Sequence, residues 1–279
     1  MKRVTAWLGE VAAPPLVFFA LVVVAWQAAT SLWEIPAYLV PSPERVLAAA
    51  GEHVADLARA SLMTAGGALC GFLLSLIVGT AAGLVFSQSR IIERSFYPYA
   101  IFLQTVPIVA IAPLVVMWCG NGFGGVVTVA FILSLFPIVT NATAGLKRVD
   151  ASLVELFEIC NASRWQTLVK LRLPNSVPYL VAGARISCGL SVIGAIVGEI
   201  FAGYGAQGFG LGYLINMNTG NLDTAYAFAA VIAATLLSIA IFVAVTSLGA
   251  TVLARWHIAA PRNDTTREAL ATSTRRNAR

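Results

Sequence analysis

The chain has 279 residues, of which 58% are hydrophobic and only 11% are charged, and its mean hydropathy is +0.82. Soluble globular domains contain roughly 45 to 50% apolar residues, so this composition excludes a soluble domain and predicts an all-α integral membrane protein with about six spans. The formal charge of +5 does not indicate a nucleic-acid partner, because most Lys and Arg residues lie at the ends of apolar runs, where they set orientation in the lipid membrane.

The first expected span runs from about Pro14 to Leu32 and contains no charged residue. A cleaved signal peptide is the alternative, because the apolar core is short and Ala28 and Ala29 follow. The proline pair that opens the run and the tryptophans at its exit favour an uncleaved anchor.

Residues 34–60 are more polar than the apolar runs on either side. Ser42-Pro43-Glu44 is typical of a helix start, with an N-cap residue, a first-turn proline and an acid at the positive end of the helix. We expect an amphipathic helix that lies on the membrane or against the spans. Its apolar face would contain Val46, Ala50, Val54 and Leu57.

The second expected span, about Leu62 to Phe86, carries small residues at strict intervals of four. Such a row lets neighbouring helices approach closely in a membrane. Four residues overshoot one helical turn by about 40°, so we expect the row to wind around the helix and to touch more than one neighbour. The row consists of Gly67, Gly71, Ser75, Gly79 and Gly83.

The third expected span, about Phe96 to Trp118, contains three prolines, Pro98, Pro107 and Pro113. Interior prolines remove backbone donors and kink helices. Pro107 and Pro113 are therefore candidates for a moving gate, with a static bend as the alternative. A fourth span follows from about Val126 to Leu146.

Two glycine-rich stretches, 120–125 and 203–208, match the spelling of a GxGxxG nucleotide motif. Neither lies between a soluble strand and a helix, so we interpret both as turns between spans. The phosphate-loop pattern GxxxxGK[ST] is absent from the sequence. The cysteines form no CxxC pair and lie far from both histidines, which predicts no metal or redox site; they are Cys70, Cys119, Cys160 and Cys188.

A polar and basic segment, Glu155–Pro174, separates the fourth and fifth apolar runs. Charged side chains are costly to place in the hydrocarbon core of a membrane, so we expect this segment to lie outside it. Span five is expected from about Tyr179 to Phe201 and contains the close-packing pair Gly194 and Gly198. Span six is expected from about Ala225 to Ala254.

Orientation follows from the positive-inside rule. With six spans and a cytoplasmic N-terminus, 16 of the 18 Lys and Arg residues lie inside or at the inner edge, all except Arg45 and Arg59. Both termini and the charged segment are then cytoplasmic. The chain divides into residues 1–60, an N-terminal span with an external helix; residues 61–256, a transmembrane core with a loop at 147–178; and residues 257–279, a basic tail expected to be disordered.

The charged segment resembles the loop of permease subunits in bacterial ABC importers. Their pattern is EAA, three residues, G, nine residues, I, one residue, LP. Here Glu155 opens the pattern, Asn161 takes the glycine place, Leu171 takes the isoleucine place, and Leu173-Pro174 close it. Leu156 and Phe157 replace the two alanines. Asparagine is, after glycine, among the residues that most readily adopt the left-handed conformation of a turn between two short helices.

More of the chain, roughly residues 40 to 255, is similar to the nitrate, sulfonate and taurine branch of these permeases, whose relatives also handle pyrimidine-type vitamin precursors. The matching pieces include Pro41-Ser42-Pro43, Ala112-Pro113-Leu114, Phe136-Pro137, Asn161-Ala162-Ser163-Arg164-Trp165 and Gly198-Glu199.

The resemblance implies a type I ABC importer permease in the bacterial inner membrane. Two such chains, most simply a homodimer, would form the pathway, with two cytoplasmic ATPase subunits beneath and an extracytoplasmic solute-binding protein above. ATP and Mg²⁺ would bind the ATPase, so we expect no cofactor on this chain and no catalysis by it. The solute would be a sulfonate, nitrate or a pyrimidine-like compound.

The implied mechanism is mechanical coupling. A short helix within about Ser152 to Trp165 would sit in a cleft of the ATPase, and Pro174 and Pro178 would form a rigid turn into span five. Glu155 and Arg164 are the expected polar contacts. The remaining coupling residues are Asn161, Ser163, Leu173, Pro174 and the buried anchors Phe157, Ala162 and Trp165. A membrane-interface position is the alternative for Trp165.

Glu199 is an acid near the outer end of span five. Either it lines the pathway or pairs across the dimer, or it bonds the backbone amides of the following glycine turn. Arg185, near the inner edge, is interpreted as a snorkelling anchor.

Two other classes of function are weighed against the importer. A secondary transporter or channel would need ionisable groups or broken helices at mid-membrane, but His53 and His257 lie outside the core and Glu199 is the only acid well inside an apolar run. An intramembrane enzyme would need a nucleophile with a base or a metal set such as HExxH, and the sequence has neither.

Overall fold

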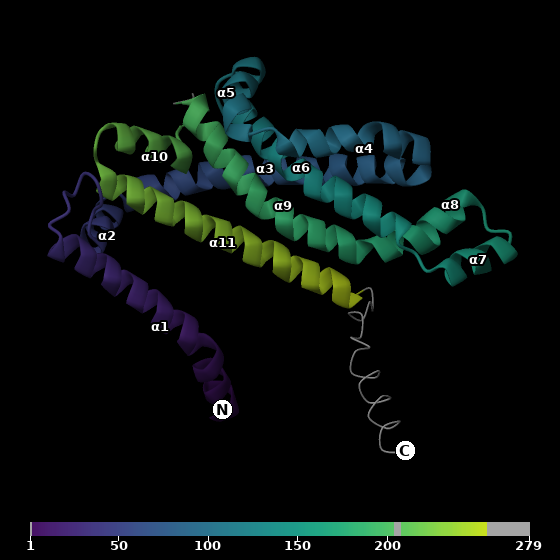
Figure 1. The fold of residues 1–279 in the computed structure, drawn as a ribbon, viewed down its shortest axis with the longest axis horizontal. Coiled ribbons are helices and arrows are strands. Elements are labelled where there is room, and N and C mark those ends of the chain that lie inside the picture. Colours follow the sequence, from purple (N-terminus) through teal and green to yellow (C-terminus); the bar gives the residue numbers. More distant parts are fainter. Residues whose placement is uncertain (1, 204–207, 256–279) are drawn as a thin grey trace.

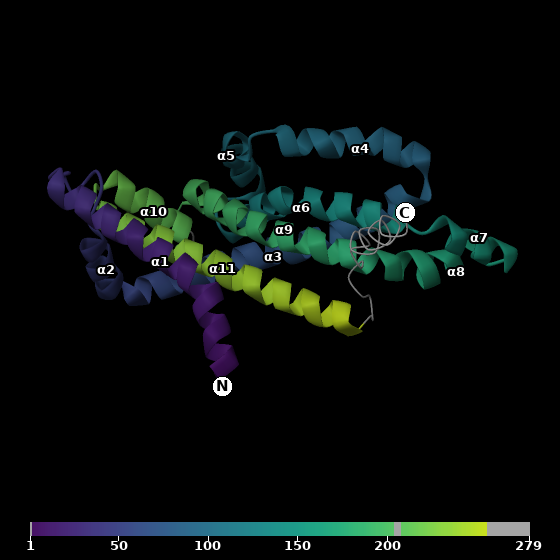
Figure 2. The ribbon, with the colours of Figure 1, turned by 60° about the horizontal axis from the view of Figure 1, so that its bottom comes forward.

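The computed structural model describes residues 2–203 and 208–255, and these form a bundle of long helices (Figures 1 and 2). The expected disordered tail, 257–279, lies outside these ranges. The helices are α1 (Lys2–Leu32), α2 (Pro43–Glu52), α3 (Val54–Gln88), α4 (Arg90–Thr105), α5 (Ile108–Cys119), α6 (Phe123–Lys147), α7 (Ala151–Ile159), α8 (Arg164–Thr167), a π-helical turn (Leu168–Arg172), α9 (Leu173–Ala202), α10 (Leu211–Gly220) and α11 (Thr224–Arg255).

Among the described residues, five helical segments are long and apolar enough to cross a membrane. They correspond to the expected spans one, two, four, five and six. The first has the expected bounds, and the other four are longer than expected. The five segments are Pro14–Leu32, Val54–Gln88, Phe123–Lys147, Arg164–Ala202 and Thr224–Arg255.

The expected third span, Phe96 to Trp118, is wrong as one helix. The structure divides it into α4 and α5, with Val106 and Pro107 extended between them (ψ 124° and 106°). The residue before a proline is driven out of the helical region and the proline has no amide to continue the ladder, so the helix ends at Thr105. The other two prolines lie inside α4 and α5. In Figure 1, α5 leaves the line of α4 and stands out from the bundle.

The small-residue row of α3 faces mainly α6, and at Gly67 it also meets Ala195 of α9, so the expectation of more than one neighbour is confirmed. The partners keep one register over the whole row: Gly71 lies against Ala130, and Gly83 lies against Ala142. A side chain built on either glycine would meet those Cβ atoms at 2.6 and 2.5 Å.

The third core helix, α9, runs antiparallel to α6 and packs as closely. Gly194 lies against the backbone of Ala130, and Gly198 lies against Val126. Ala130 is therefore held between glycines of two helices and is fully buried. Serines join the same three helices at the next level, where Ser134 Oγ donates to Ser75 Oγ at 3.0 Å and Ser187 Oγ of α9 donates to the carbonyl of Ser134 at 2.7 Å.

Helices α2, α10 and α11 form a second cluster at the end of the bundle where α3 begins. Val46 of α2 is buried in this cluster, as expected for an amphipathic helix packed against the spans. The expected apolar face is wrong at Val54, because α2 ends at Glu52 and Val54 begins α3 with an exposed side chain, whereas Leu57 is buried in the same cluster as Val46. In Figure 1, helix α1 stands apart from the bundle and approaches it near its C-terminal end, where Trp26 contacts Phe228.

Candidate functional site

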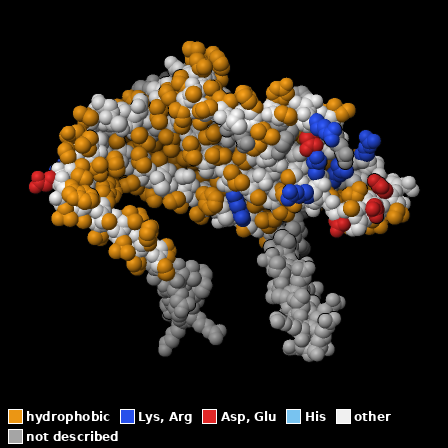
Figure 3. Space-filling model, viewed as in Figure 1, with side chains coloured by type: hydrophobic (Ala, Val, Ile, Leu, Met, Phe, Trp, Pro, Cys, Tyr) orange, Lys and Arg blue, Asp and Glu red, His pale blue; other side chains and the backbone are white. Residues whose placement is uncertain are grey.

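Charged side chains gather at one end of the molecule, around α7 and α8, whereas hydrophobic side chains cover most of the rest of the visible face (Figure 3). This end contains the segment that the sequence singled out. Residues 150–167 form a helical hairpin, which we call the α7–α8 hairpin. It projects beyond the core helices in both ribbon views.

The first helix of the hairpin is capped at its start by Asp150. Its Oδ1 accepts hydrogen bonds from the hydroxyl and the amide of Ser152, at 2.8 and 3.0 Å. These bonds hold the pKa of Asp150 below its usual value. The side chain satisfies an amide that the first turn of a helix leaves unpaired.

The turn between the two helices is built around Asn161. Its φ is +51°, the left-handed conformation expected from the sequence. The amide of Asn161 donates to the carbonyl of Glu158, and the amide of Ala162 donates to the carbonyl of Phe157, both at 2.9 Å. This pair of bonds is the Schellman motif, which ends a helix and fixes the direction of the chain that follows.

Helix α8 starts with a complete capping box. The amide of Gln166 donates to Ser163 Oγ at 3.2 Å, and the amide of Ser163 donates to Gln166 Oε1 at 2.8 Å. Such reciprocal bonds fix the first turn of a helix. The turn is therefore fixed by backbone bonds at the end of α7 and by side chains at the start of α8, all within the hairpin itself.

The expected rigid turn at Pro174 and Pro178 is wrong. The chain is helical from Arg164 to Ala202, a single segment of 39 residues that contains both prolines. The π-helical turn Leu168–Arg172 lies directly before Pro174 and shifts the hydrogen-bond ladder at the point where a proline amide is missing. The hairpin is thus connected directly to α9, and Leu173 and Pro174 are half-buried in its first turn.

Large apolar side chains cover the outside of the hairpin. Ile159 is 77% exposed and Trp165 is 71% exposed, in the most charged part of the chain. Phe157, expected as an anchor, is only half-exposed, and so is Ala162, while Glu155, Ser163 and Arg164 are exposed. Sequence reasoning missed the other members of this face, although their spacing of three along α7 was visible. We call Leu153, Leu156, Ile159 and Trp165 the hairpin apolar face.

Glu199 lies about 50 Å from the hairpin, at the other end of the continuous α8–α9 helix. It is 6% exposed, and its Oε2 accepts hydrogen bonds from Thr64 Oγ1 of α3 at 3.0 Å and from the amide of Gly212 of α10 at 2.8 Å. The amide of Leu211 donates to Thr64 Oγ1 at 2.9 Å. Glu199 therefore caps α10 and joins it to two core helices, which is the structural alternative weighed above.

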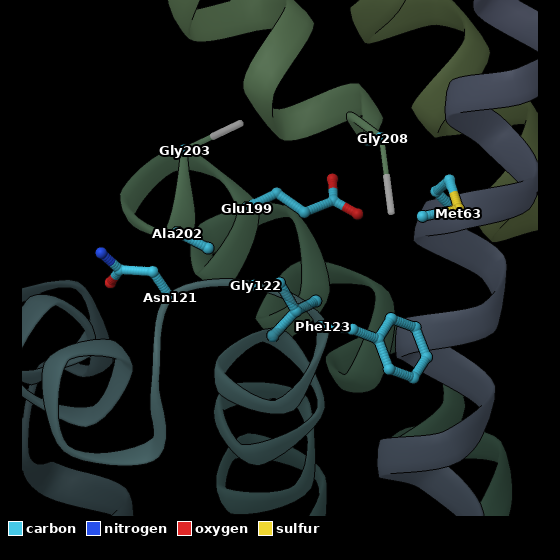
Figure 4. A pocket seen from close by; sticks show the side chains of 10 residues that line it. Met63, Asn121, Gly122, Phe123, Glu199, Ala202, Gly203 and Gly208 are labelled. Carbon is cyan, nitrogen blue, oxygen red and sulfur yellow. The ribbon is translucent and has the colours of Figure 1, made fainter. Parts of the chain in front are cut away.

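The Glu199 side chain also lines a cavity of about 170 Å³. Figure 4 shows the carboxylate pointing toward Gly208 and Met63, with Asn121 of the α5–α6 turn on the opposite side and Phe123, the first residue of α6, below it. One carboxylate oxygen of Glu199 thus accepts the hydrogen bonds that join the three helices. The same side chain borders a small cavity at this end of the bundle. Neither Pro107 nor Pro113 is among the residues that line this cavity.

Arg185 lies in α9, well away from the hairpin. Its Nε is buried, and within the described ranges no group accepts a hydrogen bond from it. The side chain as a whole is half-exposed, as a snorkelling arginine requires.

Residues 71–257 match the family model of the binding-protein-dependent transport system inner membrane component. The riboflavin transport system permease protein RibX of Chloroflexus aurantiacus is 34% identical over 238 residues, which are 85% of this chain and 87% of the relative. The formylaminopyrimidine transport permease protein ThiX of Halalkalibacterium halodurans is 32% identical over 239 residues, 84% and 92% of the two chains.

Two further similarities extend the comparison. The putative aliphatic sulfonates transport permease protein SsuC of Escherichia coli is 30% identical over 217 residues, 76% of this chain and 79% of the relative. A chain of the inward-facing MetNI methionine ABC transporter superposes with a TM-score of 0.59 at 16% identity, covering 70% of this chain and 95% of the other. At this identity the superposition shows the fold alone, which is that of a type I permease.

Proposed function

The chain belongs to the family of binding-protein-dependent transport system inner membrane components, and from this premise we propose that its α7–α8 hairpin docks on a separate ATPase. The chain is the membrane-spanning subunit of an ABC importer for a small solute, and it crosses the inner membrane several times. The ATPase would bind ATP and Mg²⁺, and this chain would bind no cofactor.

The observation that carries the proposal is the hairpin apolar face. Exposed apolar residues on a charged, projecting element favour a partner protein, because burial of such a face stabilises a complex. The caps at Asp150 and Ser163 and the Schellman turn at Asn161 order the hairpin before it binds, which lowers the entropic cost of docking. Glu155 and Arg164 would form the polar rim, and Trp165 the central anchor.

The geometry of α8 and α9 supports a direct mechanical connection. A helix of 39 residues without a break transmits a displacement of the hairpin to the level of Glu199. Glu199 and Thr64 then connect α9 to α10 and α3. In this proposal Glu199 is a positioning residue at the outer end, and the break at Pro107, with the kink site Pro113, provides the mobile part of the pathway.

The orientation proposed is cytoplasmic for the hairpin and for both termini. It rests on the positive-inside count, in which only Arg45 and Arg59 lie outside. A solute-binding protein would deliver the solute at the end of α10, and two copies of this chain would enclose the pathway. The solute would be a sulfonate, nitrate or a pyrimidine-like compound, and the relatives named for riboflavin and formylaminopyrimidine support the last class.

The experiment that tests the function is uptake into proteoliposomes that contain the permease with its ATPase, the binding protein and ATP. Uptake should require ATP and should stop when the ATPase is omitted. The double variant Glu155→Ala and Arg164→Ala should release the ATPase or separate hydrolysis from uptake while the permease stays folded. Uptake that continues without ATPase would make the chain a secondary transporter or channel.

A further inference from the structure

A cavity of about 440 Å³ lies where α4 gives way to α5, at the side of α6. It is lined by Val106 of the break, Ile108 and Ile111 of α5, Leu190 of α9 and seven residues of α6 that include Pro137. Figure 2 shows α4 and α5 forming a layer over α6 at this place. This volume is typical of a site for a small organic molecule, which takes roughly 300 to 1,000 Å³.

The walls exclude a charged ligand. All eleven lining residues whose side chains the structure describes are apolar. An anion placed there would lose its hydration without gaining a cation, which costs far more than the apolar contacts return. A neutral ring system loses little hydration and gains contact with the walls.

The backbone around the cavity nevertheless provides both a hydrogen-bond acceptor and hydrogen-bond donors. Pro137 has no amide hydrogen, so the carbonyl of Leu133, which also lines the cavity, receives no helical bond from that position. Helix α5 begins at Ile108 without a side-chain cap. The amide of Ala110 donates to the carbonyl of Pro107 at 2.9 Å, whereas the amides of Ile108 and Val109 have no preceding helical turn to bond. One wall therefore supplies an acceptor and the other supplies donors.

We propose that this cavity is a solute subsite for a neutral, flat heterocycle that carries both N–H and carbonyl groups. The inference rests on the proposed importer function and narrows its solute class to heterocycles, against nitrate and sulfonates. Because the cavity spans the Pro107 break, movement of α5 relative to α6 changes its shape, as a transient subsite on a pathway requires.

The test uses the permease with its ATPase in lipid nanodiscs and measures equilibrium binding of labelled riboflavin and thymine, with nitrate and methanesulfonate as competitors. At least one heterocycle should bind saturably, and neither anion should displace it. Leu190→Trp fills the cavity and should weaken binding by roughly tenfold or more. Leu236→Trp is the matched control, since Leu236 is an exposed leucine of α11 that does not line the cavity.

A second variant guards against misfolding of Leu190→Trp. Pro137→Ala restores an amide that bonds Leu133, so it should weaken heterocycle binding while the helix becomes more stable. Binding of neither heterocycle, displacement by the anions, or full binding by both variants would overturn the proposal. Loss of copurified phospholipid from Leu190→Trp without any effect on ring binding would instead make the cavity an acyl-chain site.

The same nanodiscs distinguish this proposal from the one it rests on. ATPase association and ATP hydrolysis are measured alongside binding. An intact, active complex that binds no heterocycle contradicts the subsite alone. A permease that does not retain the ATPase contradicts the importer mechanism itself.

Discussion

Thr64 Oγ1 donates a hydrogen bond to Glu199 Oε2 across 3.0 Å, although the two residues are 135 positions apart in the chain. Glu199 also accepts from Gly212, and Thr64 accepts from Leu211. Three helices therefore meet at one buried carboxylate. The junction joins α3, α9 and α10 at this end of the bundle.

Replacement of Glu199 by Ala should loosen this junction. Two buried donors would lose their acceptor, which costs about 1–3 kcal/mol for each unsatisfied group. We expect a lower unfolding temperature and faster amide exchange in α10, measured by hydrogen exchange with mass spectrometry. Glu199→Gln, which keeps one acceptor oxygen, should lie between Ala and the natural protein. Unchanged exchange in α10 for Glu199→Ala would show that the carboxylate does not hold the helix.

Substitutions at Asn161 should follow backbone conformation rather than side-chain size. A β-branched residue in the left-handed region costs about 1–2 kcal/mol, whereas glycine adopts it freely. Asn161→Val should therefore increase exchange in α7 and weaken ATPase binding, and Asn161→Gly should preserve both. Equal behaviour of the two variants in a pull-down with the ATPase would contradict a role for the Schellman turn.

Close packing of α3 on α6 should make Gly83 intolerant of a side chain. A Cβ at this position would meet the Cβ of Ala142 at 2.5 Å, and overpacking of this kind costs typically about 1–3 kcal/mol. Gly83→Val should lower the thermal unfolding midpoint in detergent. Gly189 of α9 is the control, because nothing lies within 4 Å of a Cβ built there. Gly189→Val should change the midpoint much less.

Acid should release the cap of α7. The folded pKa of Asp150 lies below its unfolded value because Ser152 donates to the ionised form. The cap therefore stabilises α7 above the unfolded pKa, about 3.9, and this contribution is lost as the pH falls through the lower folded pKa. Amide exchange in the first turn of α7, corrected for intrinsic rates, should rise over that range. Asp150→Ala should show no such pH dependence.

Much of this structure could be predicted from the sequence because the membrane imposes a strong pattern. Five apolar runs gave five helices, and the left-handed residue at Asn161 followed from the spacing of one motif. The prolines were harder to interpret. Pro107 ends a helix, whereas Pro174 and Pro178 lie within one, and the difference depends on a π-helical turn and on neighbouring helices that local sequence does not show.

The candidate site could also be predicted only in part, because contacts between distant parts of the chain determine the rest. The hairpin was identified by its charge and by the spacing of its motif. Phe157 was expected as an apolar anchor, but the exposed apolar residues of α7 are Leu153, Leu156 and Ile159. The exposed face of α7 depends on the direction in which the chain continues after its turn. The backbone bonds around Asn161 set that direction. Glu199 was recognised as unusual, but its hydrogen-bond partners were not predicted. They are Thr64 and Gly212, which lie 135 and 13 positions away in the chain and belong to other helices.

The most direct test of the central claim is the affinity of the permease for its ATPase when the hairpin apolar face is made polar. Leu156→Asp combined with Ile159→Asp should weaken association in detergent or nanodiscs by roughly tenfold or more, since buried apolar anchors dominate such interfaces. Leu47→Asp, at an exposed leucine of α2, is the control and should bind normally. Association of the double variant at the natural affinity would contradict the hairpin as the docking element.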